Sequence, residues 1–410
     1  MAAYGFTLSD RDNTGGADIS SVASAAGGTY RMCRPTTWTI TVPTSGSSAV
    51  GNLATMAKLL QVTRDSSLVF NGILRRIRAK GDANKASAIL TFADPMVLWP
   101  WRRVRDATGN FSKPTFAGGV GPITVGEWLY QVLTNSAAFE NGGVDSEMFT
   151  DVNIDNSTAN IFAALGTFPI SIGELATLFA NSGIAEWFID PVSVAASTYL
   201  GDLNVYDRMG TDKTATVNFD YGTGDFNVKE AQYDEDATKF CNALWYFFDK
   251  IDDEHWDANI TRGDTNFEDP PDTAIQAAID ASRSAFGYWQ DMRFWDEVEI
   301  TGSTEVNDVD NPASPLATDR VMWRRIWQFE QALRLRPKRI AVGVPTEEAP
   351  RPWTDWFLGD RVTIDYAGLG LPDIAGTQRI YGFTVEPQDD SNEELVSSIL
   401  TTNDAEEITG

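Results

Sequence analysis

The stretch that decides the fold is Leu59-Leu-Gln-Val-Thr-Arg64, followed by Leu68-Val-Phe-Asn-Gly-Ile-Leu-Arg-Arg-Ile77 and Ser87-Ala-Ile-Leu-Thr-Phe92. Apolar and polar residues alternate in these runs, as they do in half-buried strands. The segments Asp65-Ser-Ser67 and Lys80-Gly-Asp-Ala-Asn84 separate the runs with residues typical of tight turns. The pattern therefore predicts an antiparallel meander of three strands.

A second group of strands is predicted near the C-terminus, at residues 339–344, 359–366, 379–385 and 394–401. In the second of these strands, Val362, Ile364 and Tyr366 alternate with polar residues and are expected to share one face. Shorter strand patterns occur at 214–219, 222–228 and 243–248. Residues 13–29 are rich in glycine, alanine and serine, which predicts a loop or a flexible arm.

The two groups of strands can be aligned with each other. Residues 87–94 match residues 397–404 at an offset of 310, which also places Gly72 on Gly382. Residues 62–65 match residues 362–365 at an offset of 300. These matches favour two related β units in one chain, with chance similarity between unrelated strands as the alternative. Three such chains would present six similar units, which would suit a hexameric neighbour.

Four helices are predicted between and after these strands. Two capping boxes, Thr124-Val-Gly-Glu127 and Ser171-Ile-Gly-Glu174, indicate helices over residues 124–133 and 171–183. Helices are also expected over residues 273–286 and 318–335, and the last must end before Pro337.

The predicted fold class is β-rich α+β and multidomain. Two related antiparallel β-barrel-like domains would hold smaller mixed α/β domains between them. The expected boundaries are residues 1–112 for the first barrel-like domain with its N-terminal arm, 113–200 for a small mixed domain, 201–248 with 318–404 for the second barrel-like domain, 249–317 for an acidic inserted domain, and 405–410 for a tail.

Composition excludes several classes of function. The chain carries 58 acidic and 32 basic residues, and its net charge of −26 disfavours binding to DNA or to anionic membranes. A single histidine, His255, argues against histidine-based catalysis or metal binding. Two distant cysteines, Cys33 and Cys241, form no disulfide framework and are expected to be small core residues. No signal peptide or membrane anchor is predicted.

Three segments, Leu59-Leu-Gln-Val-Thr-Arg-Asp65, Leu68-Val-Phe-Asn-Gly-Ile73 and Leu90-Thr-Phe-Ala-Asp-Pro-Met-Val-Leu98, resemble the opening of the tail-hub, or minor tail, proteins of long-tailed bacteriophages. Ile184-Ala-Glu-Trp-Phe-Ile-Asp190 resembles the end of this family's middle domain, and Phe219-Asp-Tyr-Gly-Thr-Gly-Asp-Phe-Asn-Val228 resembles its re-entry strand. The segments 356–364 and 379–385 resemble its closing barrel, in the same order along the chain.

The resemblance implies a structural baseplate-hub protein rather than an enzyme. The family forms a homotrimeric, pseudo-sixfold ring at the tail tip, which takes part in DNA delivery. Expected partners are the distal tail ring or tail tube protein, the C-terminal end of the tape-measure protein, and a central fibre, spike or receptor-binding protein. Assembly in the host cytoplasm and release in the virion would explain why no secretion signal is expected. The ring strands would be residues 59–64, 68–78, 86–93, 359–366, 379–386 and 394–402.

Two acidic clusters are candidates for a glycan site and a calcium site. Carboxylates beside aromatic rings would suit a glycosidase or a glycan-binding module, and here they are Asp291, Asp296, Glu297 and Glu299 with Trp289, Phe294 and Trp295. A surface segment that packs its aromatic side chains inward is the favoured alternative. A calcium site would need oxygen ligands such as Asp249, Asp252, Asp253, Glu254 and Asp257. Because these residues lack the EF-hand spacing, a solvated acidic loop is favoured.

Three basic clusters stand out on this acidic chain, namely Arg75, Arg76, Arg78 and Lys80, then Arg102, Arg103 and Arg105, and finally Arg334, Arg336, Lys338 and Arg339. Ion pairs with neighbouring subunits and ion pairs within the chain both remain open for them. The glycine pairs 15–16, 27–28 and 118–119 lack the context of a phosphate-binding loop and are expected to be turns.

We therefore predict no catalytic residue, cofactor or metal, and no sequence-specific nucleic-acid binding. The alternatives are a tail-associated carbohydrate-active enzyme or glycan-binding module, and the hub of a bacterial contractile injection system.

Overall fold

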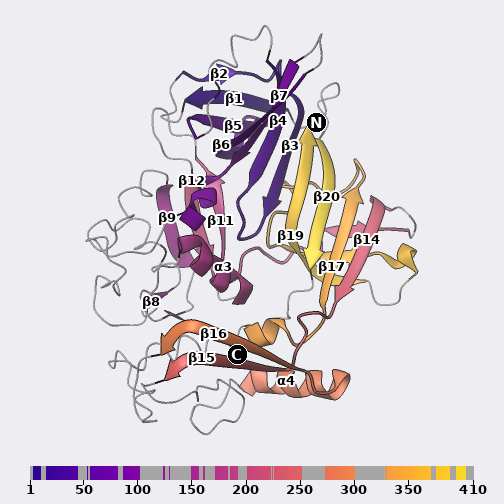
Figure 1. Cartoon of the computed structure of the whole chain (residues 1–410). Coiled ribbons are helices and arrows are strands. Elements are labelled where there is room, and N and C mark those ends of the chain that lie inside the picture. Colours follow the sequence, from indigo (N-terminus) through magenta and orange to yellow (C-terminus); the bar gives the residue numbers. More distant parts are fainter. Residues whose placement is uncertain are drawn as a thin grey trace.

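In the computed structural model, thirteen strands form one continuous sheet, and smaller sheets lie beside it (Figure 1). The described residues are 3–10, 15–44, 53, 56–81, 86–101, 123–124, 129, 149–156, 160–161, 171–182, 185–192, 201–222, 224, 226–251, 273–300, 327, 330–370, 375–387 and 394–402. The β-rich α+β class predicted from the sequence is confirmed.

The N-terminal part of the sheet contains five antiparallel strands in the spatial order β3-β4-β7-β6-β5. Their bounds are β3 (Ser24–Arg31), β4 (Thr37–Pro43), β5 (Lys58–Arg64), β6 (Ser67–Gly81) and β7 (Ala86–Ala93). We call these strands the first module. Beyond β5 lie β1 (Tyr4–Asp10) and β2 (Ala17–Asp18). The strands β5, β6 and β7 confirm the predicted meander, and its first turn holds Asp65 and Ser66 at positive φ.

The C-terminal part repeats this arrangement in the order β14-β17-β20-β19-β18, again antiparallel throughout. The bounds are β14 (Val228–Asp236), β17 (Lys338–Pro345), β18 (Arg361–Asp365), β19 (Gly376–Pro387) and β20 (Glu394–Thr402). We call these strands the second module. The short β13 (Asn218–Asp220) runs parallel to β18, and η5 (Ala367–Leu369) follows β18.

The four C-terminal strands predicted from the sequence are confirmed. Val362, Ile364 and Tyr366 are all buried, so the predicted core face of β18 is also confirmed. The earlier strand patterns fit less well. Residues 214–216 form a turn ahead of β13, and β14 begins only at Val228, where the predicted strand 222–228 was expected to end.

The two modules are a structural repeat. Along the chain, β3, β4, β5, β6 and β7 correspond in order to β14, β17, β18, β19 and β20, and each strand has the equivalent neighbours. A β-bulge occurs in the same place in both modules. It lies between Leu74 and Arg76 where β6 pairs with β7, and between Ile380 and Gly382 where β19 pairs with β20. The shared strand order and bulge show that the two modules have the same architecture and are not two unrelated groups of strands.

The bulge also fixes the register of the repeat, and it corrects the alignment made from the sequence. With the bulges superposed, Leu90 lies level with Ile399 and Arg76 lies level with Gly382. The sequence matches had placed Leu90 on Leu400, which is wrong by one residue. A shift of one residue exchanges the two faces of a strand. Leu90 and Ile399 are both buried, whereas Leu400 is only half-buried.

Strand β3 of the first module joins the two modules by pairing with β19 of the second. The ring of Tyr30 on β3 stacks on the ring of Phe383 on β19, with centroids 4.8 Å apart. Trp38 on β4 is fully buried behind Tyr30, and its indole N–H donates to the Tyr30 hydroxyl. One hydrophobic core therefore runs through both modules.

The prediction of a loop or arm over residues 13–29 is wrong, because this segment contains β2 and most of β3. Glycines obscured the strand pattern, and the structure shows why one of them is needed. A Cβ on Gly28 would lie 2.2 Å from Cε2 of Trp38, so the indole occupies the space of a side chain. Gly27 and Gly28 are consequently strand residues and not a turn.

A middle region lies between the modules in sequence. Its elements are η2 (Pro95–Trp101), β8 (Ile123–Thr124), β9 (Phe149–Asn156), β10 (Asn160–Ile161), α3 (Ile172–Ser182), β11 (Glu186–Pro191) and β12 (Gly201–Tyr206). Helix α3 confirms the helix predicted over 171–183. Thr124 ends a strand instead of opening a helix, Leu129 is helical, and the rest of the predicted helix 124–133 lies outside the described residues. Strand β12 pairs with β11 and β9, although we had predicted that the second barrel-like domain begins at residue 201.

An insert separates β14 from β17 in the second module (Figure 1). It contains β15 (Ala243–Ile251), α4 (Thr273–Phe286) and β16 (Gln290–Ile300), and α4 confirms its prediction. Because β15 and β16 are parallel, they need a crossover connection, and α4 lies within it. Residues 243–248 thus pair inside the insert and not in the second module, where they had been expected.

Helical residues 330–333 end before Pro337, as predicted, and residues 318–326 lie outside the described residues.

Candidate functional site at the junction of the modules

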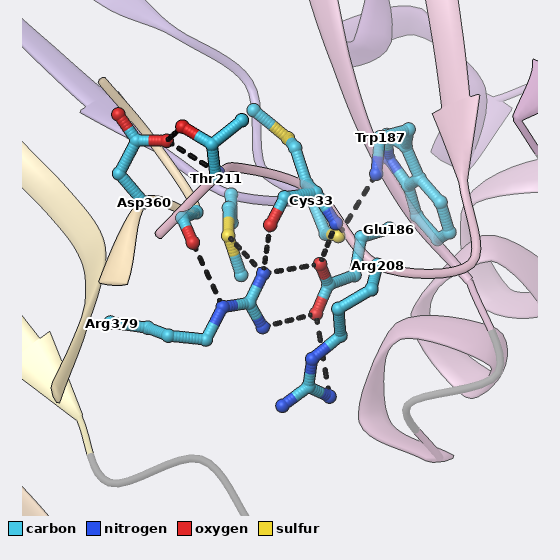
Figure 2. A network of polar contacts seen from close by, with 10 residues as sticks. Cys33, Glu186, Trp187, Arg208, Thr211, Asp360 and Arg379 are labelled. Carbon is cyan, nitrogen blue, oxygen red and sulfur yellow. Dashed lines mark hydrogen bonds and ion pairs between the residues drawn. The ribbon is translucent and has the colours of Figure 1, made fainter. Parts of the chain in front are cut away.

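A buried ion pair joins the middle region to the second module. Arg379 lies in β19, three residues after its start at Gly376, and Glu186 is the first residue of β11. The guanidinium contacts both carboxylate oxygens of Glu186, at 2.8 and 2.7 Å, and the two side chains are only 4% and 8% exposed. Figure 2 shows this two-pronged contact at the centre of a polar network. Such fork geometry fixes the relative orientation of the two strands.

The remaining hydrogen-bonding groups of this pair are also satisfied. Arg379 Nε donates to the carbonyl of Gly359 at 2.9 Å, and its Nη2 donates to the carbonyl of Met209. Glu186 Oε2 accepts the backbone N–H of Met209 at 2.7 Å. Arg208 lies 4.0 Å from the same carboxylate and is one-third exposed. Because both charges are paired and fully bonded, their burial is tolerated.

A second carboxylate holds two loops together beside the ion pair (Figure 2). Asp360 accepts the backbone N–H of Thr211 at 2.7 Å and the backbone N–H of Phe357 at 2.9 Å. The two loops touch at Gly210 and Gly359, whose φ values are +89° and +83°. A Cβ on Gly210 would lie 2.1 Å from the carbonyl carbon of Gly359, so only glycine allows this crossing.

The first module reaches the same junction through Cys33, in the turn between β3 and β4. The backbone N–H of Cys33 donates to the carbonyl of Trp187, and Cys33 Sγ accepts the backbone N–H of Trp187 at 3.4 Å. Burial raises the pKa of the Cys33 thiol well above its usual range, so this group is a hydrogen-bond acceptor and not a reactive thiolate. The first module, the middle region and the second module therefore meet at one polar centre.

Asp94 fastens the first module to the start of η2. Its carboxylate accepts the backbone N–H groups of Thr36 at 2.7 Å and Met96 at 3.0 Å, and its own N–H donates to the Thr36 carbonyl. η2 in turn packs against α3 of the middle region. Burial raises the pKa of Asp94 to about 7, in spite of the two hydrogen bonds.

This raised pKa predicts a pH dependence of stability. Asp94 is protonated more readily in the folded chain than in the unfolded chain, whose value is about 3.8. Its contribution is therefore greatest below pH 4 and is lost as the pH rises from about 4 to 7, by about 1–4 kcal/mol. We expect urea unfolding curves of Asp94→Asn to lose this part of the wild-type pH dependence. Identical pH profiles for both proteins would contradict the assignment.

Most residues of the two acidic clusters proposed from the sequence lie outside the part of the chain that the structure describes. Asp291 forms an ion pair with the buried Arg334 and is therefore engaged in structure. The side chains of Phe294, Trp295, Asp296, Glu297 and Glu299 lie outside the described residues, as do Asp249 and residues 252–257. Among the described side chains, no group of three or more His, Cys, Asp or Glu is arranged to hold a metal ion.

The basic clusters fall into two kinds. Arg334 is buried and paired with Glu330 and Asp291, Arg339 pairs with Glu235, and Lys338 lies over the Tyr381 ring, so this cluster serves contacts within the chain. Arg75 lies over the ring of Trp101. In contrast, Arg76, Arg78 and Lys80 are exposed, and the described residues offer them no ion pair. Residues 102–105 lie outside the described residues.

The two cysteines differ in how deeply they are buried. Cys241 is fully buried, as expected for a small core residue. Cys33 is half-buried and packs against the main core at a positive φ of 54°, so its prediction as a core residue is correct only in part. His255 and Gly118–Gly119 lie outside the described residues. Among the described helices, none is both long and apolar enough to cross a bilayer.

The sequence had no signal for the junction itself. Glu186 and Arg379 are 193 positions apart. Glu186 lies in a segment that resembles tail-hub proteins, and Arg379 lies at the start of the strand predicted over residues 379–385. Spacing cannot connect residues at such a distance. The one local hint was a charged residue directly before three apolar ones, in Glu186-Trp-Phe-Ile189.

No family model and no curated protein sequence matches this chain. Solved structures do match it over nearly its whole length. A prophage tail protein from Listeria monocytogenes aligns at 11% identity with a TM-score of 0.54, covering 98% of this chain and 96% of its own. A tail protein from Neisseria meningitidis gives the same values, and the 43 kDa tail protein of prophage MuSo2 from Shewanella oneidensis gives 13% identity and 0.53, covering 98% and 99%.

This chain has the fold of those phage tail proteins. The tail-protein fold accounts for both modules, the middle region and the insert together, since the alignments leave almost nothing uncovered on either side. The fold resemblance noted from the sequence is therefore confirmed, although sequence identity of 11–13% is too low to transfer any residue's role.

Proposed function

We propose that this chain is a structural hub protein at the tip of a long phage tail. The repeat of the five-strand module carries the proposal. Two equivalent modules in each chain become six in a homotrimer, so three chains can form a pseudo-sixfold ring that sits on a hexameric neighbour. The tail-protein fold, shared over nearly the whole chain, supports this role.

In this proposal the ring connects two parts of the virion tail. The distal tail ring or tail tube protein would bind one side, and a central fibre, spike or receptor-binding protein would bind the other. The C-terminal end of the tape-measure protein would lie inside the ring until DNA delivery. A net charge of −26 suits a conduit that must let DNA pass, because it repels phosphates. No sequence-specific contact with nucleic acid and no membrane anchor is proposed.

The proposed mechanism is mechanical and not enzymatic. The Arg379–Glu186 pair and the Asp360 and Cys33 contacts tie the middle region to both modules, so the three move as one body. Arg334 engages Asp291, which removes one acid from the cluster that a glycosidase would use. We expect Asp296→Asn combined with Glu297→Gln to assemble as the wild type does.

The native mass of the purified chain tests the proposal. Light scattering during gel filtration should give three times the 45.0 kDa mass of the chain, either for the free protein or after addition of its neighbouring ring protein. A particle that stays monomeric in both conditions would contradict the proposal. A monomer that cleaves cell-wall glycan, and loses this activity in the double variant above, would establish the enzymatic alternative.

A further inference from the structure

The contact between the two modules inside one chain suggests how neighbouring chains meet. Strand β3 of the first module lies along β19 of the second, through the pairs Arg31–Gly382, Tyr30–Phe383, Thr29–Thr384 and Gly28–Val385. This part of β19 lies beyond the end of β18, whose last pair is Arg361–Arg379. In terms of the repeat, the first strand of one module adds to the fourth strand of the other.

Among the described residues, the equivalent strands of the opposite modules each have an edge that pairs with no other strand. The counterpart of β3 is β14, which pairs only with β17 among the described residues. The counterpart of β19 is β6, and its residues 75–81 extend beyond β5 and pair only with β7 among the described residues. Each strand therefore offers a row of backbone groups of the kind that β3 and β19 use with each other. Figure 1 shows β14 at one margin of the large sheet.

The side chains on these two edges have opposite charge. On β14, Glu230, Asp234 and Asp236 are exposed at alternate positions, which puts them on one face of the strand. On β6, Arg76, Arg78 and Lys80 are likewise exposed at alternate positions. Among the described residues neither row forms an ion pair, although Asp236 accepts the backbone N–H of Thr238 and lies near Lys239 and Lys338. Three exposed cations in a row, without an ion pair among the described residues, favour an acidic partner surface.

The register of the repeat aligns the two rows with each other. Superposing the bulges makes Arg78 equivalent to Thr384 and Arg76 equivalent to Gly382. The same register can be followed from β7 through β4 to β3, and from β20 through β17 to β14. It makes Asp234 equivalent to Thr29 and Asp236 equivalent to Arg31. Since Thr29 pairs with Thr384, and Arg31 with Gly382, the same contact between two chains would place Asp234 opposite Arg78 and Asp236 opposite Arg76.

We infer that β14 of one protomer adds as an antiparallel strand to the distal half of β6 of the next protomer, with Asp234 opposite Arg78 and Asp236 opposite Arg76. This inference rests on the proposed trimer and names the surface that closes it. Three such contacts would alternate with the three β3–β19 contacts inside the chains. The half-buried Ile77 and Tyr233, which already pack on the core, would be covered by the same contact.

Cross-linking tests the contact directly. Residues that face each other in an antiparallel pair have Cα atoms about 4.5–5.5 Å apart, which lies within the range that a disulfide spans. We expect the variant Arg78→Cys with Asp234→Cys to form covalent dimers and then trimers on mild oxidation, with no larger species. The matched control, Arg78→Cys with Glu230→Cys, keeps both strands but moves one thiol four residues along, and it should remain uncross-linked.

Charge reversal provides the second arm. Arg76→Glu with Arg78→Glu should weaken trimer formation at least tenfold, and adding Asp234→Arg with Asp236→Arg should restore it. Lys213→Glu with Arg351→Glu makes the same change in net charge away from both rows and should leave the trimer intact. If native mass shows a trimer that neither cross-links nor responds to charge reversal, this inference fails while the proposed function stands. A wild-type chain that never assembles would remove both.

Discussion

We expect Arg379→Met to lower the free energy of unfolding by about 3–5 kcal/mol, because it leaves the Glu186 carboxylate buried without its partner. The same substitution also frees the carbonyls of Gly359 and Met209 from their donor. Urea unfolding followed by tryptophan fluorescence measures this change, and Trp187, next to Glu186, lies close to the affected site.

Two controls separate the loss of the buried charge pair from a general effect of losing arginine. Arg361→Met removes the exposed ion pair with Asp212 and should leave the unfolding curve almost unchanged. The double variant Arg379→Met with Glu186→Met should be more stable than Arg379→Met alone, since no unpaired charge stays buried. If Arg379→Met behaves like Arg361→Met, the junction does not hold the three parts of the chain together.

The second large effect is expected at Trp38. The indole is fully buried and contacts the rings of Tyr4, Phe6, Tyr30 and Phe70. Its N–H donates to the Tyr30 hydroxyl, which donates to the carbonyl of Val69, so one chain of hydrogen bonds links β4, β3 and β6. Trp38→Ala should lower the free energy of unfolding by about 3–5 kcal/mol.

The variant Trp38→Phe keeps an aromatic ring and removes the indole N–H. It should cost less than Trp38→Ala, about 1–3 kcal/mol, because most of the packing remains while one buried hydrogen bond is lost. Thermal and urea unfolding of the two variants would establish this order. Equal stability of Trp38→Ala and wild type would mean that the core of the first module is not packed around this residue.

The sequence was sufficient to predict strands whose side chains alternate clearly. The runs 59–64, 68–77 and 87–92 became β5, β6 and β7, and the C-terminal strands followed the same rule. The repeat was also predictable in outline, since the order of strands is conserved. Its register was not, because chance identities such as Gly72 and Gly382 outweighed the bulge, which leaves no mark in the sequence.

Other features depended on contacts between distant parts of the chain. Strand β3 was missed because its glycines obscure the strand pattern. Gly28 is needed there because the indole of Trp38, ten residues further on, occupies the space of a side chain. Strand β14 was missed because its exposed edge is almost entirely charged, which resembles a loop in a single sequence. The Arg379–Glu186 pair and the pairing of β15 with β16 connect segments whose separation in sequence gives no local signal.

In the proposed assembly, three chains place their six modules in one closed ring. Electron-microscopic averages of the purified assembly, viewed along its axis, test this claim most directly. We predict an annulus of six similar lobes with threefold symmetry, in which contacts within chains and contacts between chains alternate. An open or twofold arrangement, or three lobes in which the two modules of a chain stack along the axis, would contradict it.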